Sequence, residues 1–166
     1  MIRTILSVIF AVGICRAAVD KIDQDILKGY LENGAAFDFV LIDVRTSEEI
    51  SAAIGSALCK PYNLAWPNQF KDECARIPKD QRIIVYCQSG GRSSRAAAYL
   101  NTNGYTSVYD AGGFLTWKGA TVPPSEIKPA SLLPEPSMRA ATGDLRHSMP
   151  VAVDNRFAFA KGQFWQ

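Results

Sequence analysis

The chain has 166 residues, with 18 Lys and Arg against 16 Asp and Glu, so its formal net charge is +2. This length suits one domain with extensions, and the 48% hydrophobic content is enough for a buried core. The basic residues are spread out, and no dense basic run has interleaved aromatics, so nothing favours nucleic acid as a partner.

The first residues have the pattern of an export signal. Arg3 supplies a positive start, and residues 5–14 form an almost wholly apolar run that is too short to span a bilayer comfortably. Cys15 and Ala17 fit the small-x-small cleavage pattern, so we expect residues 1–17 to be removed and the protein to be exported, to the periplasm in a Gram-negative cell. No membrane association is expected after cleavage. An uncleaved anchor and a buried apolar terminus remain as alternatives.

The next part of the chain predicts helices around one buried strand. Helical spacing of apolar residues follows Asp23, a suitable N-cap, and residues 33–34 (Asn-Gly) end that helix. The continuous apolar run 39–42 predicts a strand covered on both faces. Residues 46–49 match a capping box and predict a short helix, and a further helix is expected over 69–76.

Residues 82–86 predict the clearest strand of the chain. An Ala-rich helix is expected over 92–103, with Gly104 as its stop. A strand over 105–109 and a last short helix from 114–117 follow. Strands that alternate with helices predict an α/β domain with a parallel sheet.

The composition changes after about residue 120. The remainder, 121–166, has no sustained periodicity, so we expect a Pro-rich and largely irregular tail. Near its end are four aromatic residues that we expect to pack on the domain or on a partner: Phe157, Phe159, Phe164 and Trp165.

The candidate site is the loop after the clearest strand. Cys87 follows that strand directly, at the carboxyl edge where open α/β sheets bind ligands. A turn of small residues there can aim backbone N–H groups at one point, and the helix that follows adds partial positive charge. Arg92 and Arg95 add full charges, so we expect the Cys87 thiolate to have a lowered pKa. The loop residues expected to bind substrate are Gln88, Ser89, Gly90, Gly91, Arg92 and Ser93.

Other cysteine chemistries fit the sequence less well. Four residues separate Cys87 from Arg92, whereas phosphatases of related folds have Cys-x5-Arg, so the shorter loop favours sulfur over phosphate. Arsenate reduction, with Cys59 or Cys74 as resolving thiol, is unsupported by spacing. A cysteine hydrolase needs a histidine partner, and the sole histidine, His147, lies in the tail. The cysteines are scattered without a Cys-x-x-Cys pair, so no metal site is expected.

The sequence resembles a single-domain rhodanese over about residues 19–119. The segments that carry the resemblance are 41–49, 61–63, 86–97, 104–109, 112–113 and Trp117. The resemblance implies a small rhodanese-like domain over 19–120, with a mostly parallel five-stranded sheet flanked by helices. It also implies a thiosulfate sulfurtransferase. Such an enzyme passes a sulfane sulfur from a small anion such as thiosulfate to cyanide, a thiol or a dithiol protein through a Cys87 persulfide, without a cofactor.

The resemblance also implies roles for the neighbouring residues. Residues 88–93 would cradle the sulfur and Arg92 would orient the anionic substrate, while Asp43, Arg45 and Arg95 would support the loop. Where the family often has Gly-His-Ile-Pro-Gly-Ala, residues 52–57 read Ala-Ala-Ile-Gly-Ser-Ala, which we expect to affect local rigidity rather than catalysis. A rhodanese-like binding module without turnover is the alternative from another functional class.

Two further cysteines leave two interpretations open. Removal of the signal would leave three cysteines, an odd number. Cys59 and Cys74 either form a structural disulfide that leaves Cys87 free, or lie separately as core thiols.

Overall fold

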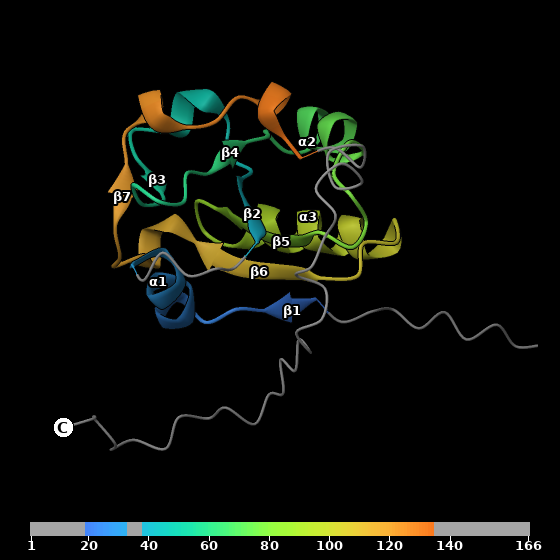
Figure 1. Ribbon diagram of the computed structural model, residues 1–166, viewed down its shortest axis with the longest axis horizontal. Helices are drawn as coiled ribbons and strands as arrows, with labels where there is room; N and C mark the ends of the chain where they lie inside the picture. Colours follow the sequence, from blue (N-terminus) through green and yellow to red (C-terminus); the bar gives the residue numbers. More distant parts are fainter. Residues whose placement is uncertain (1–18, 33–37, 135–166) are drawn as a thin grey trace, which may run out of the picture. The chain divides into compact units, whose positions relative to one another are not determined.

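The computed structural model describes residues 19–32 and 38–134. Its centre is a five-stranded sheet of order β1-β6-β5-β2-β4, in which every neighbouring pair is parallel (Figure 1). The strands are β1 (Asp20–Lys21), β2 (Phe39–Asp43), β4 (Tyr62–Asn63), β5 (Arg82–Cys87) and β6 (Val108–Gly113). The predicted α/β class with a mostly parallel five-stranded sheet is confirmed.

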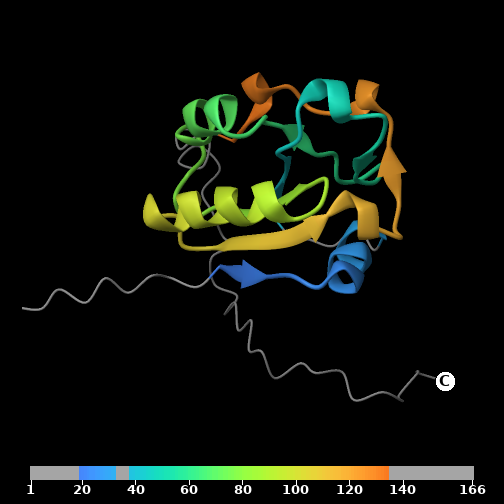
Figure 2. The ribbon, with the colours of Figure 1, turned by 180° about the vertical axis from the view of Figure 1, so that it is seen from behind.

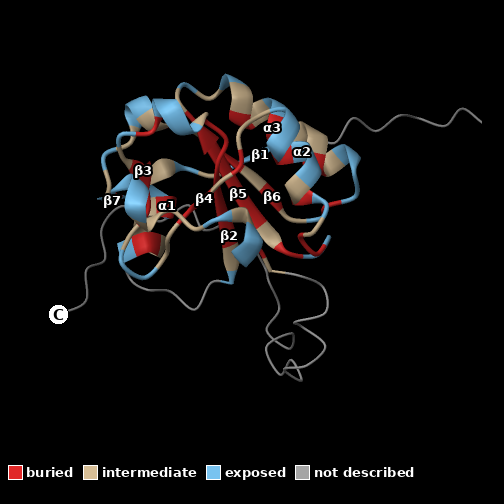
Figure 3. Cartoon of the chain, turned by 90° about the horizontal axis from the view of Figure 1, so that it is seen from above, coloured by how far each residue is buried: buried red, intermediate tan, exposed pale blue. Residues whose placement is uncertain are grey.

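The central position of β2 and β5 in the sheet explains why the sequences of these two strands are mostly apolar. Side chains alternate between the faces of a sheet, so Ile42 and Val85 enter one apolar cluster while Leu41 and Ile84 enter the other. Both faces are covered, which removes the usual polar face. All residues of β5 after Arg82 are buried, as the red strand in Figure 3 shows.

Helices cover the two faces of the sheet. Figures 1 and 2 show α1 (Gln24–Glu32) on one side and α2 (Asn68–Cys74) and α3 (Gly91–Thr102) on the other. In α1, Leu27 and Leu31 are one helical turn apart and both pack on the sheet. The opposite cluster receives Phe70 from α2, and Ala96, Ala97 and Leu100 from α3.

Two predicted elements differ clearly from the structure. Residues 46–49 form a single 3-10 turn, Ser47–Glu49, in place of a short α-helix. The last strand begins at Val108 rather than 105, because Tyr105 is held by the end of α3: its N–H donates to the Leu100 carbonyl. The Tyr105 hydroxyl donates to the Cys74 carbonyl, so this residue packs beneath α2 and does not pair with the sheet. The expected helix stop at 33–34 lies outside the described residues.

Residues 121–134, which the sequence predicts to belong to an irregular tail, pack on the domain. Strand β7 (Thr121–Val122) pairs antiparallel with β3 (Ala53–Ile54). Two 3-10 turns follow, Pro124–Glu126 and Ala130–Leu132. Prolines suit the starts of such turns, where a backbone N–H has no partner. The rest of the tail, with its aromatic end, lies outside the described residues.

Hydrogen bonds connect the turns of segment 121–134 to the edge of the sheet at β4. Lys128 N–H donates to the Pro61 carbonyl at 2.9 Å, and the Tyr62 hydroxyl donates to the Leu132 carbonyl at 2.8 Å. Leu133 is buried in the same apolar cluster as Val85. The folded domain therefore extends to at least residue 134.

The predicted signal, residues 1–17, also lies outside the described part of the chain. Of the helices in the described ranges, none has the length and apolar character needed to cross a membrane. The longest of them, α3, has 12 residues.

All three cysteines of the described domain are free thiols. Cys74 is buried in the cluster beneath α2 and α3, whereas the half-buried Cys59 packs against the cluster on the other face of the sheet. The disulfide interpretation is therefore wrong, because the sheet separates the two residues. The alternative of separate thiols holds.

Candidate active site

Cys87 is the last residue of β5 and lies at the carboxyl edge of the sheet. Its side chain is only 1% exposed. The pairing of β5 with β6 shifts register between Val85 and Cys87, so that Cys87 pairs with Gly113. A Cβ on Gly113 would lie 2.9 Å from the carbonyl oxygen of Gln88, so only glycine lets β6 approach the start of the loop this closely.

The loop after Cys87 turns back over its sulfur. Gly90 has φ 99°, a left-handed conformation that favours glycine. This conformation brings the Gly90 N–H to 3.1 Å from Cys87 Sγ. Helix α3 begins at the next residue, Gly91, so its N-terminal end faces the same region.

The pKa of Cys87 lies below the ordinary value of a thiol. Burial is the largest single influence and raises it, but several hydrogen bonds outweigh burial. These come from the Ser93 N–H and hydroxyl and from the Gly90 and Ser89 N–H groups. Each favours the negatively charged form, so the loop is built to hold a thiolate.

The Ser93 side chain lies beside the sulfur. Its residue is fully buried, and its Oγ lies 3.7 Å from Cys87 Sγ. The hydroxyl also lies 2.9 Å from the Gly90 carbonyl and 3.2 Å from the Gly112 carbonyl. A hydroxyl has one hydrogen to donate, so ionisation of Cys87 offers it a third acceptor.

Arg92 makes a bidentate ion pair with Glu49. The Nη1–Oε2 and Nη2–Oε1 distances are 2.6 and 2.7 Å. These hydrogen bonds, followed by that of the Thr46 N–H, lower the pKa of Glu49 to about 2. The pKa of Arg92 is raised, first by Glu49 and also by the neighbouring Cys87. Arg92, in the first turn of α3, is thus held by Glu49 beside the loop that follows Cys87.

Glu49 is a site residue that the sequence analysis missed. Its signal was present as the capping box, which predicts that Glu49 accepts the Thr46 N–H; that hydrogen bond is observed at 3.0 Å. The same carboxylate also accepts hydrogen bonds from Arg92, which lies 43 residues further along the chain. Only the fold brings those two residues together.

Arg45 and Asp43 form a buried pair beneath the loop. Their side chains are 1% and 0% exposed, and Nη2 lies 2.6 Å from Oδ2. Arg45 also donates to the Gln88 side-chain oxygen at 3.2 Å and to the Ala52 carbonyl at 2.8 Å. Burial lowers the pKa of Arg45, but Asp43 and Tyr86 together raise it by more. The pair thus joins the loop to the segment before β3, as the predicted supporting role requires.

Further contacts hold the strand ends around this pair. The Asn63 amide donates to the Asp43 and Arg45 carbonyls at 3.0 and 2.8 Å. The buried Tyr86 hydroxyl accepts the Ile54 N–H at 3.0 Å. This last bond fixes the segment that departs from the family pattern. Asn63 and Tyr86 both lie in segments that carry the family resemblance, 61–63 and 86–97, but neither residue was given this role.

The remaining predicted residues are less involved. Gln88 contributes its carbonyl, which accepts the Leu115 N–H at 3.1 Å, and its side chain faces Arg45. Gly91 is exposed at the start of α3. Arg95 is also exposed, and it forms no hydrogen bond or ion pair with residues 19–32 or 38–134. The structure therefore does not bring Arg95 to the sulfur.

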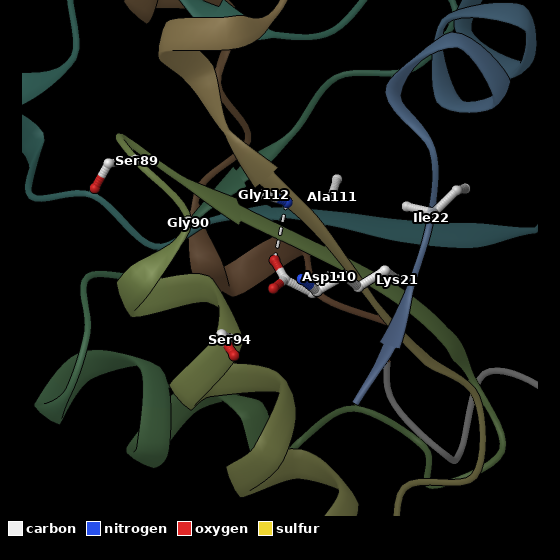
Figure 4. Close-up of a pocket in the computed structure, with 8 residues that line it drawn as sticks. All are labelled: Lys21, Ile22, Ser89, Gly90, Ser94, Asp110, Ala111 and Gly112. Carbon is white, nitrogen blue, oxygen red and sulfur yellow. Dashed lines mark hydrogen bonds between the residues drawn. The ribbon is translucent and has the colours of Figure 1, made fainter. Parts of the chain in front are cut away.

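A cavity of about 350 Å³ lies beside the loop (Figure 4). It lies between the start of α3 and the strands β1 and β6, and Cys87 is not among its lining residues. The buried Asp110 carboxylate accepts the Gly112 N–H at 2.9 Å within it. The residues that line it are Lys21, Ile22, Ser89, Gly90, Ser94, Asp110, Ala111 and Gly112. The cavity is thus lined by Ser89 and Gly90 of the loop but not by Cys87.

No group of three or more His, Cys, Asp or Glu side chains in the described ranges is placed to hold a metal ion. The site is therefore an array of hydrogen-bond donors around a buried thiol, with two arginine–carboxylate pairs beside it.

Comparisons with known proteins agree with this arrangement. The rhodanese-like domain family matches residues 23–120. A sulfurtransferase from Allochromatium vinosum is 37% identical over 101 residues, which cover 60% of this chain and 88% of the relative. The mitochondrial protein High Arsenic Content 1 from Arabidopsis thaliana is 32% identical over 123 residues, covering 66% and 70%. The crystal structure of the Alr3790 protein from Anabaena shares the fold, with a TM-score of 0.52, 23% identity and coverage of 61% and 82%. The chain therefore belongs to the rhodanese-like domain family and has sulfurtransferases among its relatives.

Proposed function

We propose that this protein is a sulfurtransferase that carries a sulfane sulfur on Cys87, with thiosulfate as one donor. The Cys87 thiolate forms a bond to the outer sulfur of thiosulfate. The sulfur–sulfur bond of thiosulfate breaks, and sulfite leaves with the bonding electron pair. A thiophilic acceptor such as cyanide, a thiol or a dithiol protein then takes the terminal sulfur, and Cys87 returns to the thiolate.

The observation that carries this proposal is the set of donors around one sulfur atom. The Gly90 N–H lies 3.1 Å from Cys87 Sγ, and Ser89 and Ser93 add further hydrogen bonds that lower the pKa of the thiol. Residues 19–32 and 38–134 contain no histidine, so within the described domain these hydrogen-bond donors are the groups that favour the nucleophilic thiolate. The same donors suit a persulfide, whose charge lies about 2 Å further out, at the terminal sulfur.

Steady-state turnover tests this proposal. Thiosulfate and cyanide are supplied together, and thiocyanate and sulfite are both measured. The proposal predicts equal amounts of the two products in wild type and none above background in Cys87→Ser. The matched control is Cys59→Ser, which removes a half-buried thiol from the other side of the sheet and should keep activity. A Cys87→Ser variant with wild-type turnover contradicts the assignment. A binding module predicts no turnover even in wild type.

One comparison favours arsenate as a second candidate substrate, because the Arabidopsis relative is named for arsenic content. The thiols of this chain support it less. Cys74 is 2% exposed and Cys59 packs against the opposite face of the sheet, so neither is placed as a ready resolving thiol. Arsenate consumption with glutathione present, in wild type and in Cys87→Ser, distinguishes this candidate from sulfur transfer.

We further propose that the protein works after export and removal of residues 1–17. The support is the charged and apolar pattern of the first residues. N-terminal sequencing of protein recovered from the periplasm of a Gram-negative host tests it. The expected first residue is Ala18, and an intact Met1 in the cell membrane contradicts it.

A further inference from the structure

The charges beside Cys87 are balanced, which is unexpected for a site that binds a small dianion. Arg92 is paired with Glu49 through two contacts of 2.6 and 2.7 Å. Arg45 is paired with the buried Asp43 carboxylate at 2.6 Å. Both arginines that reach the loop therefore have a carboxylate partner.

Glu49 is held in place from two sides. Its Oε2 atom accepts the Thr46 N–H at 3.0 Å and lies 3.1 Å from the Thr46 hydroxyl. The same oxygen lies 2.6 Å from Arg92 Nη1, while Oε1 receives Nη2. With its pKa near 2, this carboxylate stays charged at any pH where a thiolate reacts. The negative charge is thus a fixed part of the site.

The pair leaves Arg92 able to donate hydrogen bonds but removes most of its net charge. A bidentate contact through Nη1 and Nη2 uses one hydrogen of each nitrogen, so Nε–H and the two outer hydrogens remain. Arg92 is close enough to Cys87 for the sulfur to raise its pKa. An incoming donor therefore meets hydrogen-bond donors without a strong positive field.

We infer that Glu49 is a specificity-determining residue that disfavours dianionic donors such as thiosulfate relative to persulfides of the type R–S–SH. This inference rests on the proposed function. Glu49 cancels the positive charge with which Arg92 would otherwise attract a dianion, and a persulfide, which carries at most one negative charge, loses less from this cancellation.

The favoured reaction balances without another reactant. The Cys87 thiolate forms a bond to the outer sulfur of R–S–SH, the S–S bond of the donor breaks, and R–S⁻ leaves with the electron pair. The outer sulfur keeps its proton and becomes the terminal sulfur of the Cys87 persulfide. No second negative charge has to enter the site in this reaction, so Glu49 does not oppose it.

The test compares two donors in Glu49→Gln and in a matched control. The control is Glu48→Gln, because Glu48 is also an exposed carboxylate but accepts a hydrogen bond from the neighbouring Ser47 hydroxyl at 3.0 Å. The donors are thiosulfate, a dianion, and the persulfide of 2-mercaptoethanol, which carries at most one negative charge. The measured quantity is kcat/KM for sulfur loading of Cys87, at low and high salt, with the melting temperature as a check on folding.

The inference predicts that Glu49→Gln raises kcat/KM for thiosulfate about tenfold at low salt. The gain should shrink at high salt, because screening acts over about 10 Å at 0.1 M. The persulfide, with the smaller charge, should change less than about threefold, and Glu48→Gln should match wild type with both donors. Glu49→Ala removes the same charge and should show the same direction if the glutamine disturbs the pair.

Equal changes with both donors, or a fall with thiosulfate, overturn the inference and leave Glu49 with a positioning role alone. Failure of the proposed function has a different signature, because wild type would then load sulfur from neither donor.

Discussion

The backbone N–H of Gly90 lies 3.1 Å from the sulfur of Cys87, and the positive φ of Gly90 makes that contact possible. Replacement of Gly90 by alanine should destabilise the fold by about 1–2 kcal/mol, because a residue with a Cβ resists this conformation. It should also raise the pKa of Cys87, since the N–H moves away from the sulfur. Denaturant unfolding and thiolate absorbance measure the two effects.

Gly91→Ala is the matched control for this prediction. Gly91 is the neighbouring residue, has no positive φ, and a Cβ built on it meets no atom within 4 Å. It should keep both the stability and the pKa of Cys87. Equal effects of the two substitutions would show that the left-handed turn is not what positions the N–H.

The lowered pKa of Cys87 predicts reactivity below the pH at which ordinary thiols ionise. The rate of alkylation by iodoacetamide should reach half its maximum below pH of about 8.5, the usual thiol pKa. Ser93→Ala removes one donor and should move that midpoint upward. A midpoint that stays unchanged in Ser93→Ala would contradict a role for the hydroxyl.

The same shift has a consequence for folding. A thiolate favoured in the folded protein adds stability at pH above the unfolded thiol pKa of about 8.5, and this stability is lost as pH falls through the lower folded pKa. Cys87→Ser should therefore flatten the pH dependence of unfolding over that interval.

Close approach of β6 to the loop makes Gly113 sensitive to any side chain. Gly113→Ala would place a Cβ 2.9 Å from Gln88 O and Ser89 Cα, both backbone atoms that cannot move aside alone. We expect a loss of about 1–3 kcal/mol in the free energy of unfolding, with weaker sulfur loading. Gly29→Ala in α1 is the control: its Cβ meets nothing within 4 Å, and it should stabilise the helix by about 0.5–1 kcal/mol.

The Arg45–Asp43 pair predicts a cost when only one partner is removed. Arg45→Met leaves the Asp43 carboxylate buried without its counter-ion, which should cost about 3–5 kcal/mol. The double variant Asp43→Asn with Arg45→Met should recover part of that loss. A single variant as stable as wild type in urea unfolding would show that Asp43 finds another partner.

The sequence was informative where a pattern is local. The apolar run of β5, with Cys87 directly after it, predicted both the central strand and the place of the site. The glycines and the helix that follow predicted the turn of N–H groups, and Gly90 makes that contact. These features depend on residues that are neighbours in the chain.

Long-range partners were beyond the reach of such patterns. The capping box explained Glu49 locally, so nothing required a second partner, yet its main contact is with Arg92. Strand β7 contains two residues, too few to show the alternation of a strand, so its pairing with β3 is specified only by the fold. Tyrosine is common in β-strands, so Tyr105 was predicted to begin the strand, but its hydrogen bonds with Leu100 and Cys74 hold it outside the sheet.

Intact mass measurement of the full chain tests whether Cys87 carries the transferred sulfur. Wild type and Cys87→Ser are incubated with thiosulfate, and separately with the persulfide of 2-mercaptoethanol, and then freed of donor. Wild type should gain one sulfur that cyanide removes, and Cys87→Ser should gain none. One added sulfur on Cys87→Ser, or none on wild type with either donor, would contradict this role of Cys87.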